Sequence, residues 1–307
     1  METILRELQP FDKEAMDRAI EKDHGLHPDD KFLKPGRIPH IWCPGCGLGV
    51  VLTCFIEAVR RKGLSVDECA VVSGIGCTGR VAGYLEMDTY HTTHGRALPF
   101  ATGLVLAKPN LKVTVFSGDG DLFAIGGNHL IHAARRNIDL KVLCVNNFNY
   151  GMTGGQVAPT TPLEAKTSTT PLGNAEPGFN LPHLAHASGA VYVARWTTYH
   201  PRQLVDSICR TFEKKGLTFI EAIAPCPIGY GRPNKIGSGL DEMRLYREMS
   251  EVRNGADPKD AEITLGGKIM VGAFVDTERP DFLENYRTKV VAKAQQRAGD
   301  RQKGRAA

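Results

Sequence analysis

The sequence predicts an α/β fold, in which a mainly parallel sheet carries helices on both faces. Short apolar segments rich in β-branched residues recur along the chain, and segments with helical periodicity lie between them. Unusual polar residues follow several of the apolar segments. Because ligands bind beyond the carboxyl ends of parallel strands, these polar residues are expected to form the functional site.

The alternating segments define a core domain with an extension at each end. The expected strands are residues 70–73, 113–117, 140–146, 190–194 and 218–224. The expected helices are residues 48–61, 98–107, 122–136 and 201–215. The core domain therefore spans residues 38–235, between an N-terminal extension, 1–37, and a C-terminal extension, 236–307. Each extension has one helical pattern, at residues 11–22 and 282–296.

Composition and charge favour a soluble, cytoplasmic protein that binds neither nucleic acid nor membranes. The chain of 307 residues has a formal net charge of +4, which gives little electrostatic attraction for nucleic acid. No apolar run approaches the ~20 residues of a membrane span, and the amino terminus is too charged for a secretory signal. The eight cysteines are accordingly expected to be thiols or metal ligands rather than disulfides.

Two polar segments follow neighbouring expected strands. The sequence GDGD occupies residues 118–121, and NNFN occupies residues 146–149. A βαβ unit brings both strand ends to one edge of the sheet, so Asp119 and Asn147 can supply oxygens to one hard cation such as magnesium. The glycines of GDGD let the backbone approach phosphate groups, although GDGD alone is also compatible with an ordinary tight turn. The long Gly-, Thr- and Pro-rich stretch 150–180 is expected to be an active-site loop.

A subset of the cysteines lies in turns at expected strand ends or before a helix. Cys43 and Cys46 form a CPGC segment, whereas Cys77 and Cys226 each follow an expected strand. Strand ends of one sheet converge, so these thiols can surround one metal cluster. Zinc binding and thioredoxin-like redox chemistry also remain open for a single CxxC. The other cysteines are expected to be buried small residues: Cys54, Cys69, Cys144 and Cys209.

The spacing of GDGD and NN resembles the thiamine-diphosphate fingerprint of the transketolase and 2-oxo-acid enzymes. The segments YGMTGGQ at 150–156 and HGRA at 94–97 are similar to those of 2-oxo-acid:ferredoxin oxidoreductase β subunits. The resemblance covers about residues 38–235. It implies the thiamine-diphosphate-binding fold, with magnesium held by Asp119, Asn147 and the main chain of Asn149.

The same resemblance implies a set of cofactor contacts and one 4Fe-4S cluster. Cys43, Cys46, Cys77 and Cys226 would be the cluster ligands. His94 has a rationale of its own, since an imidazole beside a diphosphate can donate a hydrogen bond, although a helix-capping histidine would also explain it. The implied cofactor contacts are Ile75, Gly76, Cys77, Thr78, His94, Gly118, Gly120, Asp121, Gly151 and Met152. The candidate catalytic residues are His94, Thr78 and Arg80.

The implied reaction is the coenzyme A-dependent oxidative decarboxylation of a 2-oxo acid, with electrons passing through the cluster to ferredoxin. No glutamate lies in a motif that matches the family's activating carboxylate. The resemblance assigns this glutamate to a partner α subunit, in αβ pairs that dimerise, and the chain alone is expected to be inactive.

The segments GGQ at 154–156 and PIGYGR at 227–232 resemble those of the 2-oxoglutarate group, which forms succinyl-CoA and CO2 in a reaction that the resemblance allows to run in either direction. Arg80 or Arg232 can pair with a distal substrate carboxylate. Pyruvate and branched-chain 2-oxo acids remain open as substrates. The sequence is also compatible with a non-redox thiamine-diphosphate decarboxylase or carboligase, and with a metal-binding interaction subunit whose GDGD and NN segments are only turns.

Overall fold

The structure of the chain, a computed structural model, describes residues 29–306, without the side chains of 299 and 301–306. The helix expected at residues 11–22 and most of the expected extension 1–37 lie outside the described residues. The described chain forms an eight-stranded sheet in the order β2-β1-β3-β4-β8-β7-β10-β9. Its strands are β1 Cys69–Ser73, β2 Asp88–His91, β3 Lys112–Gly118, β4 Lys141–Asn146, β7 Tyr192–Thr197, β8 Thr218–Ile223, β9 Ser250–Val252 and β10 Ile269–Asp276.

The sheet confirms the predicted mainly parallel α/β fold. Each neighbouring pair from β2 to β7 is parallel, whereas β10 pairs antiparallel with β7 and parallel with the edge strand β9. Every residue of β1, β4, β7 and β8 is buried. This pattern is typical of strands covered on both faces, which is why they are apolar runs in the sequence.

Helices cover both faces of the sheet and enclose two apolar cores. On one face, α2 Leu48–Arg61 packs against α6 Pro201–Glu213, and Phe55 of α2 meets Phe116 of the sheet edge-to-face. On the other face, α3 Ala97–Ala107, α4 Gly127–Arg135 and α5 Leu181–Ser188 pack in sequence. Adjacent strand residues such as Val71 and Val72 therefore point into different cores.

The expected helix at 122–136 is divided in the structure. A π-helical segment, Asp121–Ile125, precedes α4, and Gly126 separates the two. The sequence pattern predicted one continuous helix because its apolar positions keep helical spacing across the break. At the start of the π-helical segment, the Asp121 side chain accepts hydrogen bonds from the backbone of two neighbouring turns, at Ile75 and Gly95.

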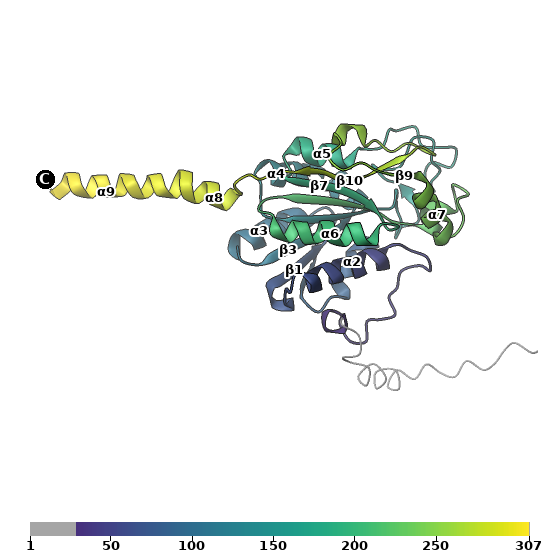
Figure 1. The fold of residues 1–307 in the computed structure, drawn as a ribbon, viewed down its shortest axis with the longest axis horizontal. Coiled ribbons are helices and arrows are strands. Elements are labelled where there is room, and N and C mark those ends of the chain that lie inside the picture. Colours follow the sequence, from purple (N-terminus) through teal and green to yellow (C-terminus); the bar gives the residue numbers. More distant parts are fainter. Residues whose placement is uncertain (1–28, 307) are drawn as a thin grey trace, which may run out of the picture.

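Part of the expected C-terminal extension, residues 236–307, joins the sheet. Helix α7, Gly239–Met249, is followed by β9 and β10, and β10 pairs with β7 with Gly272 opposite Arg195. The run IMVGAFVD of β10 has an ordinary strand pattern, but its charged surroundings obscured it in the sequence. The last helices, α8 Phe282–Tyr286 and α9 Ala292–Ala306, extend away from the sheet (Figure 1).

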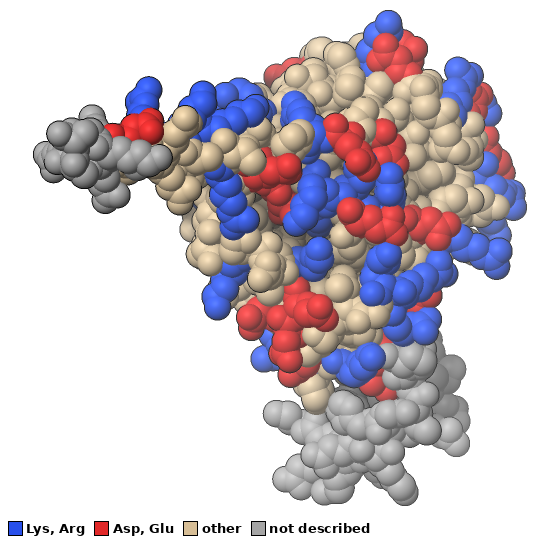
Figure 2. Space-filling view, turned by 60° about the vertical axis from the view of Figure 1, so that its left-hand side comes forward, with Lys and Arg blue, Asp and Glu red and all other residues tan. Residues whose placement is uncertain are grey.

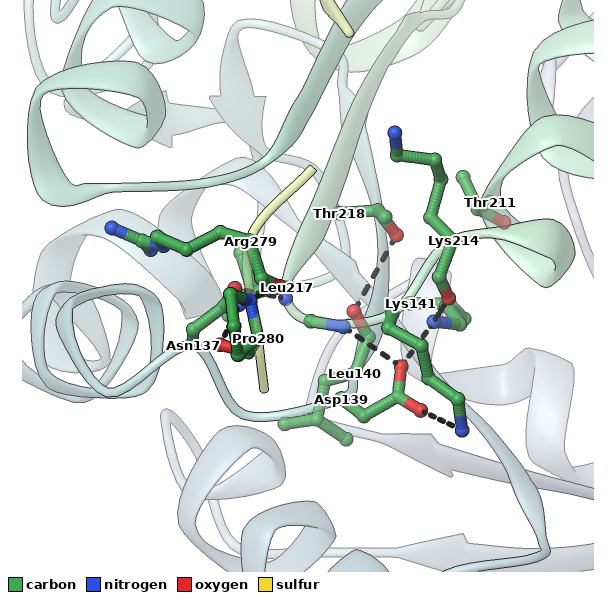
Figure 3. A network of polar contacts seen from close by, with 12 residues as sticks. Asn137, Asp139, Leu140, Lys141, Thr211, Lys214, Leu217, Thr218, Arg279 and Pro280 are labelled. Atoms are coloured by element: carbon green, nitrogen blue, oxygen red, sulfur yellow. Dashed lines mark hydrogen bonds and ion pairs between the residues drawn. The ribbon is translucent and has the colours of Figure 1, made fainter. Parts of the chain in front are cut away.

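A polar network at the amino ends of β4 and β8 anchors the chain that leads to α8 (Figure 3). The Asn137 side-chain oxygen accepts from Leu217 N at 3.1 Å, and its amide donates to the carbonyls of Arg279 at 3.1 Å and Pro280 at 3.0 Å. Since Asn137 ends the turn after α4, one side chain joins three segments that are far apart in sequence.

A buried lysine lies in the same network. Lys141 Nζ pairs with Asp139 and donates to the carbonyl of Lys214 at 2.8 Å (Figure 3). Burial lowers the pKa of Lys141, and the Asp139 carboxylate opposes this effect. The pair lies at the start of β4, whereas Asn146 and the candidate site lie at the other end of the strand.

The charged side chains of the surface are mixed in sign on one face. On the face shown in Figure 2, Lys and Arg side chains are interspersed with Asp and Glu. Within residues 29–306, helices are too short or too polar to cross a membrane.

Candidate active site

Asp119 and Asn147 lie beside each other at the carboxyl edge of the sheet. They follow β3 and β4, which are parallel neighbours with Gly118 opposite Val145. The Asp119 side chain is buried, and among the described residues it has no Lys, Arg or His partner. The Thr160 hydroxyl donates a hydrogen bond to it. A buried carboxylate without a cationic side chain is costly, so this position fits a bound metal cation.

The turn after β4 has a conformation that the amide side chains maintain. Phe148 has φ +61°, which is unusual for a large side chain. Asn149 Nδ2 donates to the carbonyl of Asn147 at 2.6 Å, and the Tyr150 hydroxyl donates to the carbonyl of Gly120 at 3.3 Å. A Cβ on Gly120 would lie 2.4 Å from the Tyr150 ring, so the GDGD turn and this turn can pack only with glycine there.

One cleft contains every residue expected to contact the cofactor and every expected magnesium ligand. Tyr150 and Thr153 also line it, although neither was among the expected contacts. The described lining has no Glu, Lys or Arg. The expected residues along the cleft are Ile75, Gly76, Cys77, Thr78, His94, Gly118, Asp119, Gly120, Asp121, Asn147, Asn149, Gly151 and Met152.

Asp121 connects the segments that form the cleft. Its carboxylate accepts from Ser117 Oγ at 2.5 Å, from Gly95 N at 2.8 Å and from Ile75 N at 3.3 Å. His94 Nδ1 lies 2.6 Å from the same carboxylate, a separation typical of an ion pair, although hydrogen-bond geometry is lacking. Asp121 therefore borders the cleft while its oxygens bind the protein's own donors, and this arrangement fixes the neighbouring turns.

Two arginines considered in the sequence lie away from this cleft. Arg80 lies in a 3₁₀ segment, Thr78–Gly83, with its side chain exposed, and Arg232 is exposed as well. Neither belongs to the cleft lining. Arg80 is thus not brought to the position that its candidate catalytic role requires in this chain alone.

The cysteines singled out in the sequence converge beside the cleft. The CPGC turn closes with Cys46 N donating to the carbonyl of Cys43 at 3.0 Å. Gly47 N donates to the carbonyl of Pro225 at 3.1 Å, which brings this turn against the segment that carries Cys226. Trp42 Nε1 donates to the carbonyl of Cys77 at 2.8 Å, which brings in the third segment.

Burial raises the pKa of Cys46 to about 12, and the nearby Cys226, Cys77 and Cys43 thiols add to this effect. Burial likewise raises the pKa of Cys77 to about 11, with further contributions from Cys226 and Cys43. Within residues 29–306, no group of three or more His, Cys, Asp or Glu could hold a single metal ion. A 4Fe-4S cluster binds each cysteine to a different iron, so its ligands need only surround a larger space.

The cysteines and the cleft share residues. Cys77 belongs to the cleft lining, and Cys226 Sγ lies 3.8 Å from Asn149 Oδ1. The remaining cysteines lie apart: Cys54, Cys69 and Cys144 are buried, and Cys209 is partly buried in α6. A cluster and a cofactor bound at these two places would be in close proximity.

The sequence did not indicate Thr160 as a site residue. It lies in the long loop 150–180, which begins with a short hairpin formed by β5 Asn149–Tyr150 and β6 Gln156–Val157. The loop then returns so that Thr160 reaches Asp119. The length and composition of the loop were the available signal, but they do not identify which threonine makes the contact.

The buried Asp119 leads to a pH-dependent prediction. Burial raises its pKa from a usual 3.8 to about 7. Because the folded-state pKa is raised, protonated Asp119 favours the metal-free fold. Its contribution to the free energy of unfolding is fully present below pH 4 and is lost as the pH rises to 7. Asp119→Asn, neutral throughout, should therefore raise the melting temperature of metal- and cofactor-free enzyme above pH 7, with the gain disappearing toward pH 4.

The difference in pKa corresponds to at most about 4 kcal/mol. Thermal unfolding of both proteins across this pH range is the measurement. A difference in melting temperature that did not change with pH would contradict the assignment of a buried ionised Asp119.

The cleft lies largely within a segment that matches a known protein family. Residues 74–222 match the family described as thiamine pyrophosphate enzyme, C-terminal TPP binding domain; this cofactor is also called thiamine diphosphate. The match begins in the turn after β1 and ends in β8, so it includes the GDGD and NN segments. The chain is a thiamine-diphosphate enzyme subunit.

Relatives that match over most of the chain define the family more narrowly. The chain is 51% identical to the 2-oxoglutarate synthase subunit KorB of Methanocaldococcus jannaschii, over 84% of this chain and 96% of that protein. It is 49% identical to KorB of Methanothermobacter marburgensis, over 84% and 90% respectively. The chain therefore belongs to the 2-oxoglutarate:ferredoxin oxidoreductase family, as a β subunit of the KorB type.

A solved structure agrees with this family. The 2-oxoglutarate:ferredoxin oxidoreductase of Magnetococcus marinus, with 2-oxoglutarate, coenzyme A and succinyl-CoA bound, superimposes with a TM-score of 0.77. It is 30% identical and covers 90% of this chain, which in turn covers 92% of it.

Proposed function

We propose that the cleft binds thiamine diphosphate through a magnesium ion held by Asp119, Asn147 and Asn149. We further propose that the cysteines beside it, Cys43, Cys46, Cys77 and Cys226, hold one 4Fe-4S cluster. The observation that carries both proposals is the position of Cys77, which lines the cleft and also lies within the group of thiols. The buried Asp119 carboxylate favours the proposal of a magnesium ion here, because the cation would supply the missing countercharge.

When bound, thiamine diphosphate supplies the electron sink for decarboxylation of a 2-oxo acid, and a 4Fe-4S cluster accepts electrons one at a time. The chain's own residues bind and orient these groups. The backbone of the GDGD turn would accommodate phosphate oxygens, and the His94 side chain, which lies beside Asp121 in the cleft lining, would donate a hydrogen bond to them. Thr78 is buried along the cleft and can orient a bound group with its hydroxyl.

The cleft needs a second subunit to complete it. Its described lining has neither a glutamate to activate the cofactor nor an arginine or lysine to pair with a substrate carboxylate. We assign both groups to an α subunit, which the KorB family implies, in αβ pairs that dimerise into a heterotetramer. By analogy with the ligands of the Magnetococcus marinus enzyme, the substrates are 2-oxoglutarate and coenzyme A. Ferredoxin is the proposed acceptor, and the cytoplasm the proposed location.

Anaerobic purification of the chain with its accompanying subunit tests the proposal. Addition of 2-oxoglutarate and coenzyme A should produce an electron paramagnetic resonance signal of a reduced cluster, and neither compound alone should sustain turnover. A signal with pyruvate instead would retain the mechanism and change the substrate. Thiamine-diphosphate-dependent decarboxylation by an iron-free enzyme would indicate a non-redox decarboxylase or carboligase.

A further inference from the structure

A fully buried ion pair lies in the sheet behind the cleft. Arg195 of β7 and Glu221 of β8 are register partners, and Arg195 Nε donates to Glu221 Oε2 at 2.6 Å. Their side chains are 1% and 0% exposed. Burying two charges in a sheet contributes little net stability, since apolar side chains of similar size would fill the space at lower cost. The pair therefore calls for a role other than stability.

The second oxygen of Glu221 contacts the end of β4, the strand that leads into the proposed magnesium residues. Asn146, the last residue of β4, donates from Nδ2 to Glu221 Oε1 at 2.7 Å. The oxygen of the same amide, Asn146 Oδ1, accepts from Phe148 N at 3.0 Å. Because a carboxylate only accepts, it requires the Asn146 nitrogen to face it and so directs the amide oxygen toward Phe148. The Glu221 side chain thus determines the orientation of this amide.

The bond to Phe148 stabilises the turn that forms the cleft. Phe148 lies between Asn147 and Asn149 and has the left-handed φ described above, a conformation that needs support from its surroundings. An amide that accepts from the backbone two residues ahead provides this support.

The Arg195 guanidinium is also held by hydrogen bonds outside the ion pair. Arg195 Nη1 donates to the carbonyl of Ala261 at 2.6 Å and lies 3.5 Å from the carbonyl of Met270. These carbonyls belong to the C-terminal chain that adds β10 to the sheet. The guanidinium therefore cannot turn away from Glu221 without losing partners on a third segment.

We propose that Glu221, held in place by Arg195, is a positioning residue that acts through Asn146 to fix the turn at Phe148 and thereby the magnesium ligands Asn147 and Asn149. The inference rests on the proposed magnesium site. Outer-shell partners of metal ligands typically contribute a factor of 10 to 100 in metal affinity. Glu221 and Asn146 would act in this way without contacting the ion.

The test uses the enzyme with its partner subunit, stripped of cofactor and metal. The dissociation constant for thiamine diphosphate at limiting and saturating magnesium is measured together with the melting temperature. Asn146→Ala and Glu221→Gln are each expected to weaken magnesium-dependent binding by roughly tenfold or more. The double variant should have a dissociation constant for thiamine diphosphate no higher than that of the single variant with the larger loss. Both changes break the same chain of contacts, so their effects should not add.

Asp139→Asn is the matched control. It disrupts the ion pair with Lys141 at the opposite end of β4, so it should lower the melting temperature and leave the dissociation constant unchanged. If Glu221→Gln behaves like this control, or if Asn146→Ala binds with wild-type affinity, the positioning role is excluded.

Asn146→Ala leaves the Arg195–Glu221 charges in place and so remains informative even if the Glu221 variant fails to fold. Wild-type binding that did not depend on magnesium would instead reject the magnesium site itself, so failure of the proposed function and failure of this inference are distinguishable.

Discussion

Asp119→Asn is expected to abolish magnesium-dependent binding of thiamine diphosphate and to lower 2-oxoglutarate turnover by roughly 10³-fold. The substitution removes the anionic oxygen that would attract the proposed cation at the end of β3. Neighbouring Asp121 cannot replace it, because its oxygens already accept from Ser117, Gly95 and Ile75. Calorimetric titration of stripped enzyme with the cofactor, with and without magnesium, measures the loss directly.

The folded state of this variant provides its own control. Since asparagine removes a buried charge, the variant should be at least as stable as the wild type above pH 7 when both are free of metal. Loss of binding in a stable protein would then reflect the missing ligand rather than unfolding. Wild-type affinity in the variant would show that magnesium binds elsewhere.

Cys226→Ser and Cys46→Ser are each expected to reduce the iron content from about four atoms per chain to well below one, and to eliminate ferredoxin reduction. Both thiols lie in turns joined by the hydrogen bond from Gly47 N to the carbonyl of Pro225, whereas the described thiols outside the proposed ligand set belong to regular helices and strands, Cys54 in α2, Cys69 in β1, Cys144 in β4 and Cys209 in α6. Iron determination and the paramagnetic resonance spectrum measure the cluster, and reduction of ferredoxin with 2-oxoglutarate and coenzyme A measures electron transfer.

Cys209→Ser is the matched control for these variants. Cys209 is also partly buried, and its thiol lies 3.7 Å from the carbonyl of Ala58 in the neighbouring helix, a contact that a serine hydroxyl can keep. Full iron content and normal electron transfer are expected. Iron loss in this variant equal to that of Cys226→Ser, or full iron in Cys226→Ser, would be incompatible with the proposed ligands.

The fold was largely predictable because its signals are local. All the expected strands recur in the sheet, with ends that shift by a few residues, since continuous apolar runs are the direct consequence of burial on both faces. Strand β10 was missed although its residues have a strand pattern, because it lies beyond a charged helix and pairs antiparallel with a distant strand.

The proximity of candidate site residues was predictable where they follow neighbouring parallel strands. Asp119 and Asn147 are far apart in sequence, and they meet because β3 and β4 are adjacent and parallel. Thr160 could not be identified in this way, since an irregular loop brings it to Asp119. The catalytic role of Arg80 stays a prediction: Arg80 is close to Thr78 in sequence, but its side chain is exposed and outside the cleft lining of this chain.

The sequence by itself determined the fold class, the family and the residues whose chemistry suits a diphosphate, a cation and a metal cluster. The fold class follows from periodicity and residue type, which act over a few positions of the chain, whereas the family and the candidate site residues follow from the resemblance of short motifs to those of a known family. Only the tertiary structure decided that Asp121 binds the protein's own turns and that Glu221, Arg195 and Asn146 form one buried chain of contacts. Such contacts depend on strand register and side-chain orientation across the sheet, and neither is encoded in any local segment.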